Sequence, residues 1–510
     1  GIGEVTIGGT PGNFSTNPLL VLSGDHIFIK NIKIKYTTHI GLLIGRNTPR
    51  QNNILIDGVE VDRVGNFSML LRNIDTVLVK NSASYYSSRP GNENLSSPCQ
   101  WPSGIKFFGS NDCTILDSEI AYSRGEGLNF QNSIRCSAYR NKIYDNPLNV
   151  YNDNSSKLMI FQNLIYNSPG TNPDLWQTCP ADPNTNWAGT GILIANEGGC
   201  MNSGNPSYVN CETVCTAFQS TLKTPNVDSM FVYNNIFQNT GRAIGFWEGV
   251  TTPQGNNCIK NVHIFNNTII GALGMPGAGN NGFVNAFFPS FNIFTNAHYS
   301  SLQNVTISRN IFTYDTLTYS NMKPYSRTFH ASHPTPNGIT LSNNLWIKDH
   351  ELLGTADEVR NEMPFSTYLL TDSVFSVVPC QQNLFWVKNT TPAFDFLNND
   401  YLGMPRNLNS TNVGALEYNA SCKITSAEDI MANSNKIVVF PNPCNACAKL
   451  NFTNLPPGDY AYSIYSLLGK EVANGQVTGN AAEIDNSLKG VFVIVLRSST
   501  KQFRKKIILN

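Results

Sequence analysis

Hydrophobic and polar positions along the chain recur in one short phrase: apolar, any, apolar, any, polar, Asn, any, apolar. The phrase reads MFVYNNIF at 230–237, VHIFNNTI at 262–269, VTISRNIF at 305–312 and ITLSNNLW at 339–346. Its apolar residues alternate with the period of a strand, and the polar-Asn pair interrupts the alternation before the next apolar residue. A phrase that recurs in this way predicts a repeated unit of strand, corner and strand.

The spacing of the copies decides which kind of repeat this is. Earlier copies place Ser118, Asn141 and Asn163 at intervals of 23 and 22 residues. So short a unit cannot hold two packed helices, but it can hold one turn of a coil whose strands hydrogen-bond to the next turn about 4.8 Å away. A second phrase, GEGLNFQN at 125–132 and PLNVYNDN at 147–154, supplies another strand on each turn. The sequence therefore predicts an all-β chain with a right-handed parallel β-helix.

The repeated Asn has a structural explanation in such a coil. Equivalent positions stack, so a side-chain amide can bond to the same amide on the turns above and below. Asn also tolerates the left-handed conformation that sharp corners need. We predict a ladder at Asn141, Asn163, Asn235, Asn267, Asn310 and Asn344. Cys113 and Cys136 also occupy equivalent positions and are predicted to stack in the interior.

Changes in pattern along the chain predict four segments. Residues 1–350 form the β-helix with long insertions, 351–420 close it, 421–436 are a polar linker, and 437–510 carry a new apolar pattern. The chain opens on GIGEVTIGG, which reads as the inside of a strand, so we expect that its original beginning is missing.

The last segment has its own motifs. From residue 436 onward it holds nine Lys and Arg against four Asp and Glu, although the whole chain has a net charge of zero. Its motif residues are Pro441, Asn442, Pro443, Gly458, Tyr460, Gly469, Gly490, Lys505 and Lys506. In this order the segment resembles the type A C-terminal sorting domain of the type IX secretion system of Bacteroidetes. The resemblance implies a small antiparallel β-sandwich, bound by the outer-membrane translocon and its shuttle protein, on a protein secreted or anchored at the outer cell surface.

Composition removes several classes of function. Only 14% of the residues are charged, so no basic field for nucleic acid exists, and no apolar run approaches a membrane span. No cofactor and no metal site are predicted, and calcium has no cluster of Asp residues to support it. The type IX resemblance adds an O-glycosylation pattern, Asp-Ser/Thr-apolar, which the chain matches at Thr76, Ser229, Thr316 and Ser373.

Function is expected on the second strand of each turn, because long insertions at 84–112, 166–228, 271–303 and 313–337 would rise beside it as binding loops do. If residues such as Leu148 and Val150 point inward, alternate residues point outward. Amides, aromatic rings and an amine on one face suit a sugar polymer, so we predict polysaccharide binding. The predicted binding residues are Lys106, Asn129, Gln131, Asn149, Tyr151 and Trp247.

Catalysis by this face stays open. A glycoside hydrolase needs two carboxyl groups roughly 5 to 10 Å apart, and a polysaccharide lyase needs a base and a cation for the uronate. Candidates for these roles are Glu126, Asp153, Glu197, Glu248, Lys106 and Arg124. The alternative is a noncatalytic surface adhesin or structural protein whose only definable activity is recognition by the secretion translocon.

Overall fold

The structure is a computed structural model of the chain. The residues that it describes in the larger unit are 5–11, 13–45, 50–88, 102–168, 190–196, 227–238, 240, 243–248, 259–270, 291–293, 302–313, 338–347, 358–360, 398–403, 405–406 and 413–416. In the tail it describes 438–440, 449–453, 455, 458–466, 471–485, 487–498 and 502–509. The chain divides into two compact units, Gly1–Cys422 and Lys423–Asn510.

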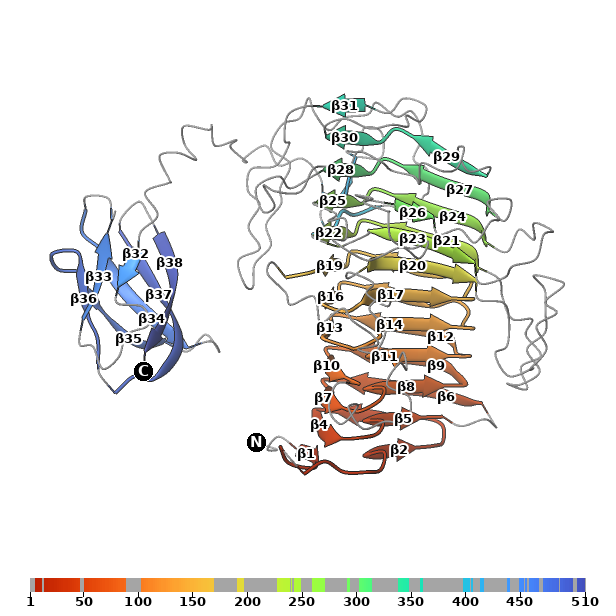
Figure 1. Cartoon of the computed structure of the whole chain (residues 1–510), viewed down its shortest axis with the longest axis horizontal. Helices are drawn as coiled ribbons and strands as arrows, with labels where there is room; N and C mark the ends of the chain where they lie inside the picture. The colour runs from red at the N-terminus through yellow and green to blue at the C-terminus, as the bar shows by residue number, and fades with distance from the viewer. Residues whose placement is uncertain are drawn as a thin grey trace, which may run out of the picture. The chain divides into compact units, whose positions relative to one another are not determined.

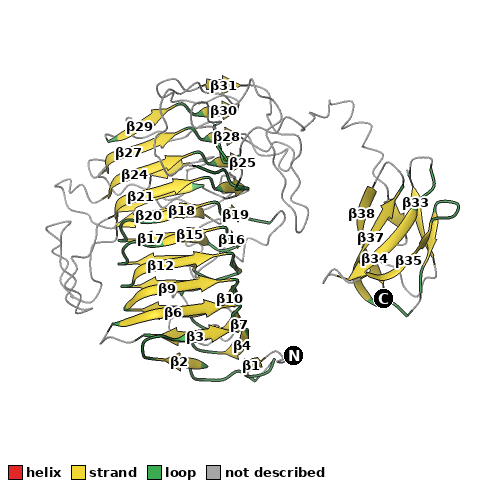
Figure 2. Cartoon of the chain, turned by 180° about the vertical axis from the view of Figure 1, so that it is seen from behind, coloured by secondary structure: helices red, strands yellow, loops and turns green. Residues whose placement is uncertain are grey.

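The larger unit is a parallel β-helix, which confirms the predicted fold (Figure 1). Along most of the coil, successive strands belong in turn to three sheets, here called sheet 1, sheet 2 and sheet 3, and each strand pairs in parallel with the strand three places later. At the C-terminal end, after the last described strand of sheet 2, the interval between paired strands shortens to two places and then to one. All of the described regular structure is strand or bridge (Figure 2).

Sheet 1 consists of β1 (Val5–Gly8), β4 (Ile32–Thr37), β7 (Glu60–Val64), β10 (Ala83–Ser87), β13 (Glu119–Ala121), β16 (Lys142–Tyr144), β19 (Leu164–Tyr166), β22 (Ile236–Gln238), β25 (Thr268–Ile270), β28 (Ile311–Thr313), β30 (Leu345–Ile347) and β31 (Glu358–Arg360). Sheet 2 consists of β2 (Leu20–Leu22), β5 (Leu42–Ile44), β8 (Met69–Arg72), β11 (Ile105–Phe108), β14 (Glu126–Gln131), β17 (Leu148–Asp153), β20 (Thr190–Asn196), β23 (Ile244–Glu248) and β26 (Phe291–Ile293). Sheet 3 consists of β3 (Phe28–Lys30), β6 (Gln51–Asp57), β9 (Ile74–Lys80), β12 (Asn111–Leu116), β15 (Ser137–Tyr139), β18 (Met159–Phe161), β21 (Val227–Tyr233), β24 (Ile259–Phe265), β27 (Leu302–Ser308) and β29 (Ile339–Ser342).

The polar-Asn pair forms the corner between sheet 3 and sheet 1. The polar residue takes the left-handed conformation, as at Asn234 (φ 54°) and Arg309 (φ 56°). The Asn that follows points inward, and its amide donates to the amide oxygen of the next turn. These amide-to-amide bonds are 2.9–3.1 Å long and join Asn141, Asn163, Asn235, Asn267, Asn310 and Asn344 in order. Each copy of the sequence phrase thus contributes one Asn to a single hydrogen-bonded column.

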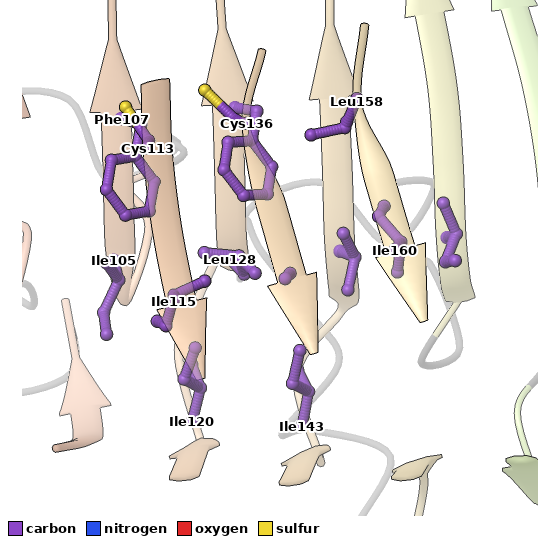
Figure 3. Packing of buried hydrophobic residues seen from close by; sticks show 14 of the residues in the cluster. Ile105, Phe107, Cys113, Ile115, Ile120, Leu128, Cys136, Ile143, Leu158 and Ile160 are labelled. Carbon is purple, nitrogen blue, oxygen red and sulfur yellow. The ribbon is translucent and has the colours of Figure 1, made fainter. Parts of the chain in front are cut away.

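Stacking also builds the interior. The rings of Phe107 and Phe130, on β11 and β14, stack with centroids 5.1 Å apart. Cys113 and Cys136 are buried free thiols on the neighbouring sheet (Figure 3). Because equivalent residues of successive turns pack on one another, the core is a continuous apolar column inside the coil.

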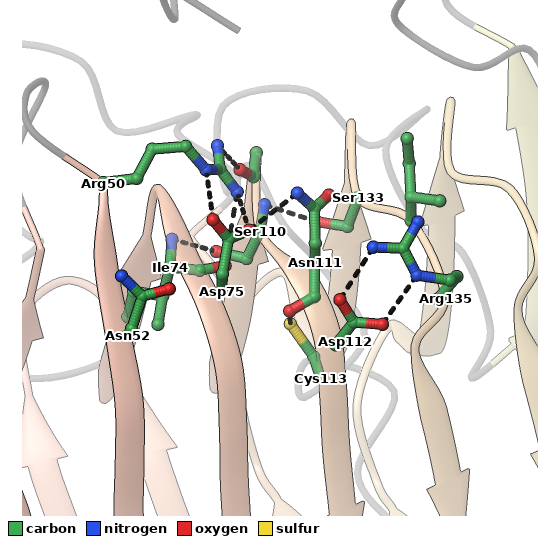
Figure 4. A network of polar contacts seen from close by, with 12 residues as sticks. Arg50, Asn52, Ile74, Asp75, Ser110, Asn111, Asp112, Cys113, Ser133 and Arg135 are labelled. Carbon is green, nitrogen blue, oxygen red and sulfur yellow. Dashed lines mark hydrogen bonds and ion pairs between the residues drawn. The ribbon is translucent and has the colours of Figure 1, made fainter. Parts of the chain in front are cut away.

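The corner between sheet 2 and sheet 3 carries a second ladder, made by serine. The backbone N–H of Ser110 donates to Ser133 Oγ at 3.2 Å, and that of Ser133 donates to Ser155 Oγ at 2.9 Å. Outside this ladder Arg50 forms a bidentate pair with Asp75, at 2.7 and 2.9 Å (Figure 4). Turns are therefore linked at this corner by side chains inside and outside the coil.

Residues 351–420 were expected to close the β-helix. The part of this segment that the structure describes near its end, residues 398–403, 405–406 and 413–416, lies along the side of the coil. The carbonyl of Asp400 accepts a bond from Gln162 Nε2, and Gly414 N donates to the carbonyl of Arg309 at 2.7 Å. These contacts follow the corner between sheet 3 and sheet 1 across several turns. The coil itself continues past residue 350, because β31 pairs in register with β30.

The tail unit contains two antiparallel sheets, as predicted. One holds β32 (Val438–Phe440), β33 (Lys449–Thr453) and β36 (Ala481–Glu483); the other holds β35 (Glu471–Gln476), β34 (Ala461–Ser466), β37 (Gly490–Arg497) and β38 (Gln502–Leu509). Buried residues from both sheets, including Leu450 and Ile464, form one core.

Of the tail motif residues, Tyr460 is buried in this core, Gly458 has a φ of 150°, and Gly490 begins β37. Lys505 and Lys506 lie on β38. Pro441, Asn442, Pro443 and Gly469 lie outside the described residues.

Candidate functional site

The register of sheet 2 brings most of the predicted binding residues onto one outer face. Lys106, Asn129, Tyr151 and Leu193 occupy one column across β11, β14, β17 and β20. Phe108, Gln131, Asp153 and Ala195 occupy the next column. Neighbours in a column are one strand spacing, about 4.8 Å, apart. We call these two columns, with Ser103 and Glu126 beside them, the sheet 2 face.

The prediction was wrong for Asn149 and Leu148, which exchange roles. Asn149 is fully buried in the interior, where its Oδ1 accepts bonds from the backbone and side-chain amides of Asn146. Leu148 instead clusters with Tyr151 on the outer face. The reason is that strict alternation fails where the chain enters sheet 2, and two successive residues point inward. Gly127 shows this: a Cβ there would lie 2.7 Å from Asn146 Nδ2.

Glu126 is a buried acid of the sheet 2 face. It is 4% exposed, and its Oε2 accepts a bond of 2.6 Å from Ser103 Oγ. Burial raises the pKa of Glu126, although the charge of Lys106 and the hydrogen bonds from Ser103 and Asn129 act in the opposite direction. The carboxyl therefore tends to keep its proton to higher pH than an exposed Glu, as a proton donor requires.

Asp153 is a second carboxylate on this face, and Gln131 Nε2 donates to its Oδ2 at 2.5 Å. It does not make a hydrolase pair with Glu126. Glu126 pairs in register with Leu148, so Asp153 is five residues further along the next strand. At about 3.3 Å per residue the two Cα atoms are about 17 Å apart, whereas hydrolase carboxyl groups are roughly 5 to 10 Å apart.

Lys106 lies among aromatic rings at one end of the face. Its Nζ is 5.6 Å from the ring centroid of Phe67 and 5.5 Å from that of Phe108. The Arg72 guanidinium lies 5.5 Å from the same Phe108 ring. Cation–π contacts of this kind hold the ammonium group in place without neutralising it.

The remaining predicted residues are placed in part. Arg124 is half-buried at the turn before β14, and its backbone N–H donates to the carbonyl of Ser87. Trp247 and Glu248 lie on β23. Glu197, Thr316 and Ser373 lie outside the described residues. Thr76 is exposed and Ser229 is half-buried, and each has a φ near 60° at the start of a sheet 3 strand.

A set of tyrosines on the outer face of sheet 1 was missed by the sequence reasoning. Tyr144 and Tyr166 stack at 4.7 Å, and Tyr86 and Tyr122 stack at 4.7 Å. The signal was present in the sequence, because Tyr144 and Tyr166 each follow the inward Ile of a sheet 1 strand.

No cluster among the described residues contains three His, Cys, Asp or Glu side chains that could hold a metal ion. The same residues contain no helix long and apolar enough to cross a membrane.

Comparison with known proteins identifies the tail. Residues 438–510 match the family described as the secretion system C-terminal sorting domain. No curated protein matches the chain.

Solved structures similar to this chain include the A-module of mannuronan C-5 epimerase AlgE4 from Azotobacter vinelandii, at 11% identity and a TM-score of 0.26, over 70% of this chain and 86% of that one. An alginate lyase from Paenibacillus sp. is similar at 11% identity and a TM-score of 0.29, over 66% and 99% of the two chains. The Dettilon tailspike protein is similar at 12% identity and a TM-score of 0.29, over 68% and 60%. The tail, residues 438–510, is thus a type IX secretion-system sorting domain, and the chain that carries it is a secreted or cell-surface parallel β-helix protein.

Proposed function

We propose that the exported β-helix binds a polysaccharide along the sheet 2 face. One observation carries the proposal: Asn129, at the centre of this face, is 1% exposed, and its Oδ1 has no hydrogen-bond partner among the described residues. A buried acceptor left unpaired costs about 1–3 kcal/mol. A ligand hydroxyl that donates to this oxygen would remove the cost.

The chemistry around Asn129 fits a sugar chain. Glu126 and Asp153 are further acceptors for hydroxyl groups, and Lys106 is a donor. These groups lie on three adjacent strands, so a polymer running across the strands would meet one set of contacts per strand. Cleavage is not part of the proposal, because Glu126 and Asp153, the two acids of this face, have Cα atoms about 17 Å apart.

The test is a polysaccharide-binding screen of the full-length protein beside the variants Asn129→Ala and Lys106→Ala. Asn304→Ala is the matched control, because Asn304 is an exposed residue of β27 whose amide donates to Asn261 Oδ1 at 2.7 Å. We expect wild type and control to bind the same polymer, and both face variants to lose at least tenfold in affinity with an unchanged melting temperature. Equal binding by all four proteins, or no binding by folded wild type, would refute the proposal.

A second candidate function, a noncatalytic adhesin or structural protein, is favoured by one observation. Leu148, Tyr151, Leu193 and Ala195 are buried together on the sheet 2 face. A face filled by its own apolar side chains leaves little room for a polymer beyond β14. Failure of the binding screen would leave this function as the better account.

The tail and the corner residues support two finer proposals. Export through the translocon and its shuttle protein would depend on residues 438–510, so their deletion should leave the protein inside the cell envelope. O-glycosylation would attach sugar at Thr76, which is exposed, and at Ser229, whose Oγ donates to Asp228 Oδ1 at 3.0 Å. Intact-mass measurement of exported protein, repeated on Thr76→Ala, would detect it as a lost hexose-sized increment.

A further inference from the structure

The outer face of sheet 1 gathers charged and phenolic side chains over five adjacent strands, β4 to β16. The register aligns them in two columns. One column holds Lys33, Glu60, Ala83, Glu119 and Lys142, and the other holds Lys35, Asp62, Tyr85, Ala121 and Tyr144. We call these residues, with Arg63 beside them, the sheet 1 face.

The cations of the sheet 1 face are already paired. Lys35 Nζ lies 2.8 Å from Glu60 Oε1 and 3.6 Å from Asp62 Oδ2. Arg63 pairs with the same Asp62 Oδ2. Further along, Lys142 Nζ is 3.4 Å from Glu119 Oε1. No cation here is held ready for an anionic ligand, so an acidic polymer would have to break existing pairs.

The phenols surround Glu119. Tyr144 Oη donates to Glu119 Oε1 at 2.7 Å, and Tyr85 on the neighbouring strand also bonds to this carboxylate. Ala83 lies between Glu60 and Glu119 in their column, so these two carboxylates are separated by two strand spacings, about 9.6 Å between Cα atoms.

Asp62 is the residue that this network leaves incomplete. It is 5% exposed, and its Oδ2 carries both ion pairs, while its Oδ1 has no partner among the described residues. Burial raises the pKa of Asp62 against the charge of Arg63, which agrees with a carboxyl that is incompletely solvated. These ion pairs use only Oδ2, so Oδ1 is an acceptor that the network leaves over.

We infer that the sheet 1 face is a second saccharide-binding surface, which takes a neutral sugar unit over Ala83 between Glu60 and Glu119. A sugar hydroxyl donates to Asp62 Oδ1 while Oδ2 keeps its pairs with Lys35 and Arg63. The phenol of Tyr85, next to Asp62 in register, contributes both a polar group and the edge of its ring. A neutral sugar fits because the atom left without a partner, Asp62 Oδ1, is a hydrogen-bond acceptor. It can be satisfied by a hydroxyl donor, and a charged ligand is not required. This inference stands apart from the sheet 2 face and does not require it.

The test is affinity electrophoresis of the full-length protein in gels that contain dextran, laminarin or xylan as neutral probes, or polygalacturonate as an acidic probe. Asp62→Asn keeps the shape of the side chain, and Tyr85→Phe keeps the ring, so both variants should fold. Asp117→Asn is the matched control, because Asp117 is an exposed corner acid that pairs with Arg140 at 2.7 Å.

We expect a neutral polymer to retard the wild type and Asp117→Asn, and both sheet 1 variants to lose at least tenfold in affinity at an unchanged melting temperature. Asn129→Ala, on sheet 2, should retain this binding. Three results would overturn the inference: undiminished binding by Asp62→Asn and Tyr85→Phe, retardation by polygalacturonate alone, or binding lost only in Asn129→Ala. The last result would still leave the sheet 2 proposal intact.

Discussion

Replacement of Asn267 by Ala should destabilise the β-helix more than any surface change of similar size. The Asn267 amide is fully buried and makes five hydrogen bonds. Its Oδ1 accepts from the backbone and side-chain amides of Asn235, both at 3.0 Å, and its Nδ2 donates to Asn310 Oδ1 at 2.9 Å and to the carbonyls of Val232 and Phe265 at 2.9 and 3.2 Å.

The expected loss follows from what the alanine leaves behind. The backbone N–H of Asn235 becomes a buried donor without its acceptor, which costs about 1–3 kcal/mol, and each other bond lost contributes about 0.5–1.5 kcal/mol net. The Asn235 amide keeps its bond of 2.8 Å to the carbonyl of Ile160, so it is not fully orphaned. With four such bonds lost beside the orphaned donor, we expect the free energy of unfolding to fall by about 3–9 kcal/mol.

Urea unfolding of the full chain, followed by far-ultraviolet circular dichroism, measures this loss in the transition of the larger unit. Asn304→Ala is the control, since an exposed amide should change stability by less than about 0.5 kcal/mol. A loss below about 1 kcal/mol for Asn267→Ala, or a loss equal to that of the control, would refute this reasoning. It would show that the amide column is a consequence of the β-helix geometry and does not stabilise the fold.

Three further predictions concern the interior and the sheet 2 face. Because burial raises the pKa of Glu126, the folded state retains a proton that the unfolded state releases, so stability falls as pH rises above the unfolded value of about 4.3; Glu126→Gln should remove this fall, with a urea midpoint above that of wild type at pH 8 and close to it at pH 4. Gly127→Ala should cost about 1–3 kcal/mol in thermal unfolding, because its Cβ would lie 2.7 Å from Asn146 Nδ2. Cys113 and Cys136 should resist alkylation in the native protein and react after unfolding, as read by peptide mass mapping, because both are buried and burial raises the pKa of the Cys113 thiol.

The sequence was sufficient for the fold wherever a residue's role repeats from turn to turn. Asn235 and Asn267 could be assigned to one column because the same phrase surrounds both. The path of residues 398–403 and 413–416 could not be predicted, because many of their contacts with the coil are made by backbone carbonyls such as that of Asp400, which leave no side-chain signature. Corner geometry carries no simple sequence pattern, and this is why Asn149 was placed on the wrong side.

The candidate site was predictable to a similar extent. Alternation places Lys106, Asn129 and Gln131 correctly on one face, since all three follow the irregular entry into the strand. Alternation does not report distance along the strand, so it suggested Glu126 and Asp153 as possible partners although about 17 Å separates their Cα atoms. The unpaired oxygens of Asn129 and Asp62 could not be predicted from the sequence, because whether an oxygen finds a hydrogen-bond donor depends on all of its neighbours in the folded structure.

The segment at 398–416 changes how this repeat protein should assemble. In a simple solenoid each turn touches only its neighbours, so folding can spread from any nucleus by nearest-neighbour steps. Here the bond between Gln162 and Asp400 spans 238 residues, and that between Asn266 and Gly414 spans 148. Contacts between residues so far apart in the sequence form late in folding, because closing the long loop between them costs conformational entropy before the contact can form. The segment should therefore dock only after the turns that it contacts have folded. Because it contacts several turns at once, it should make those turns unfold cooperatively.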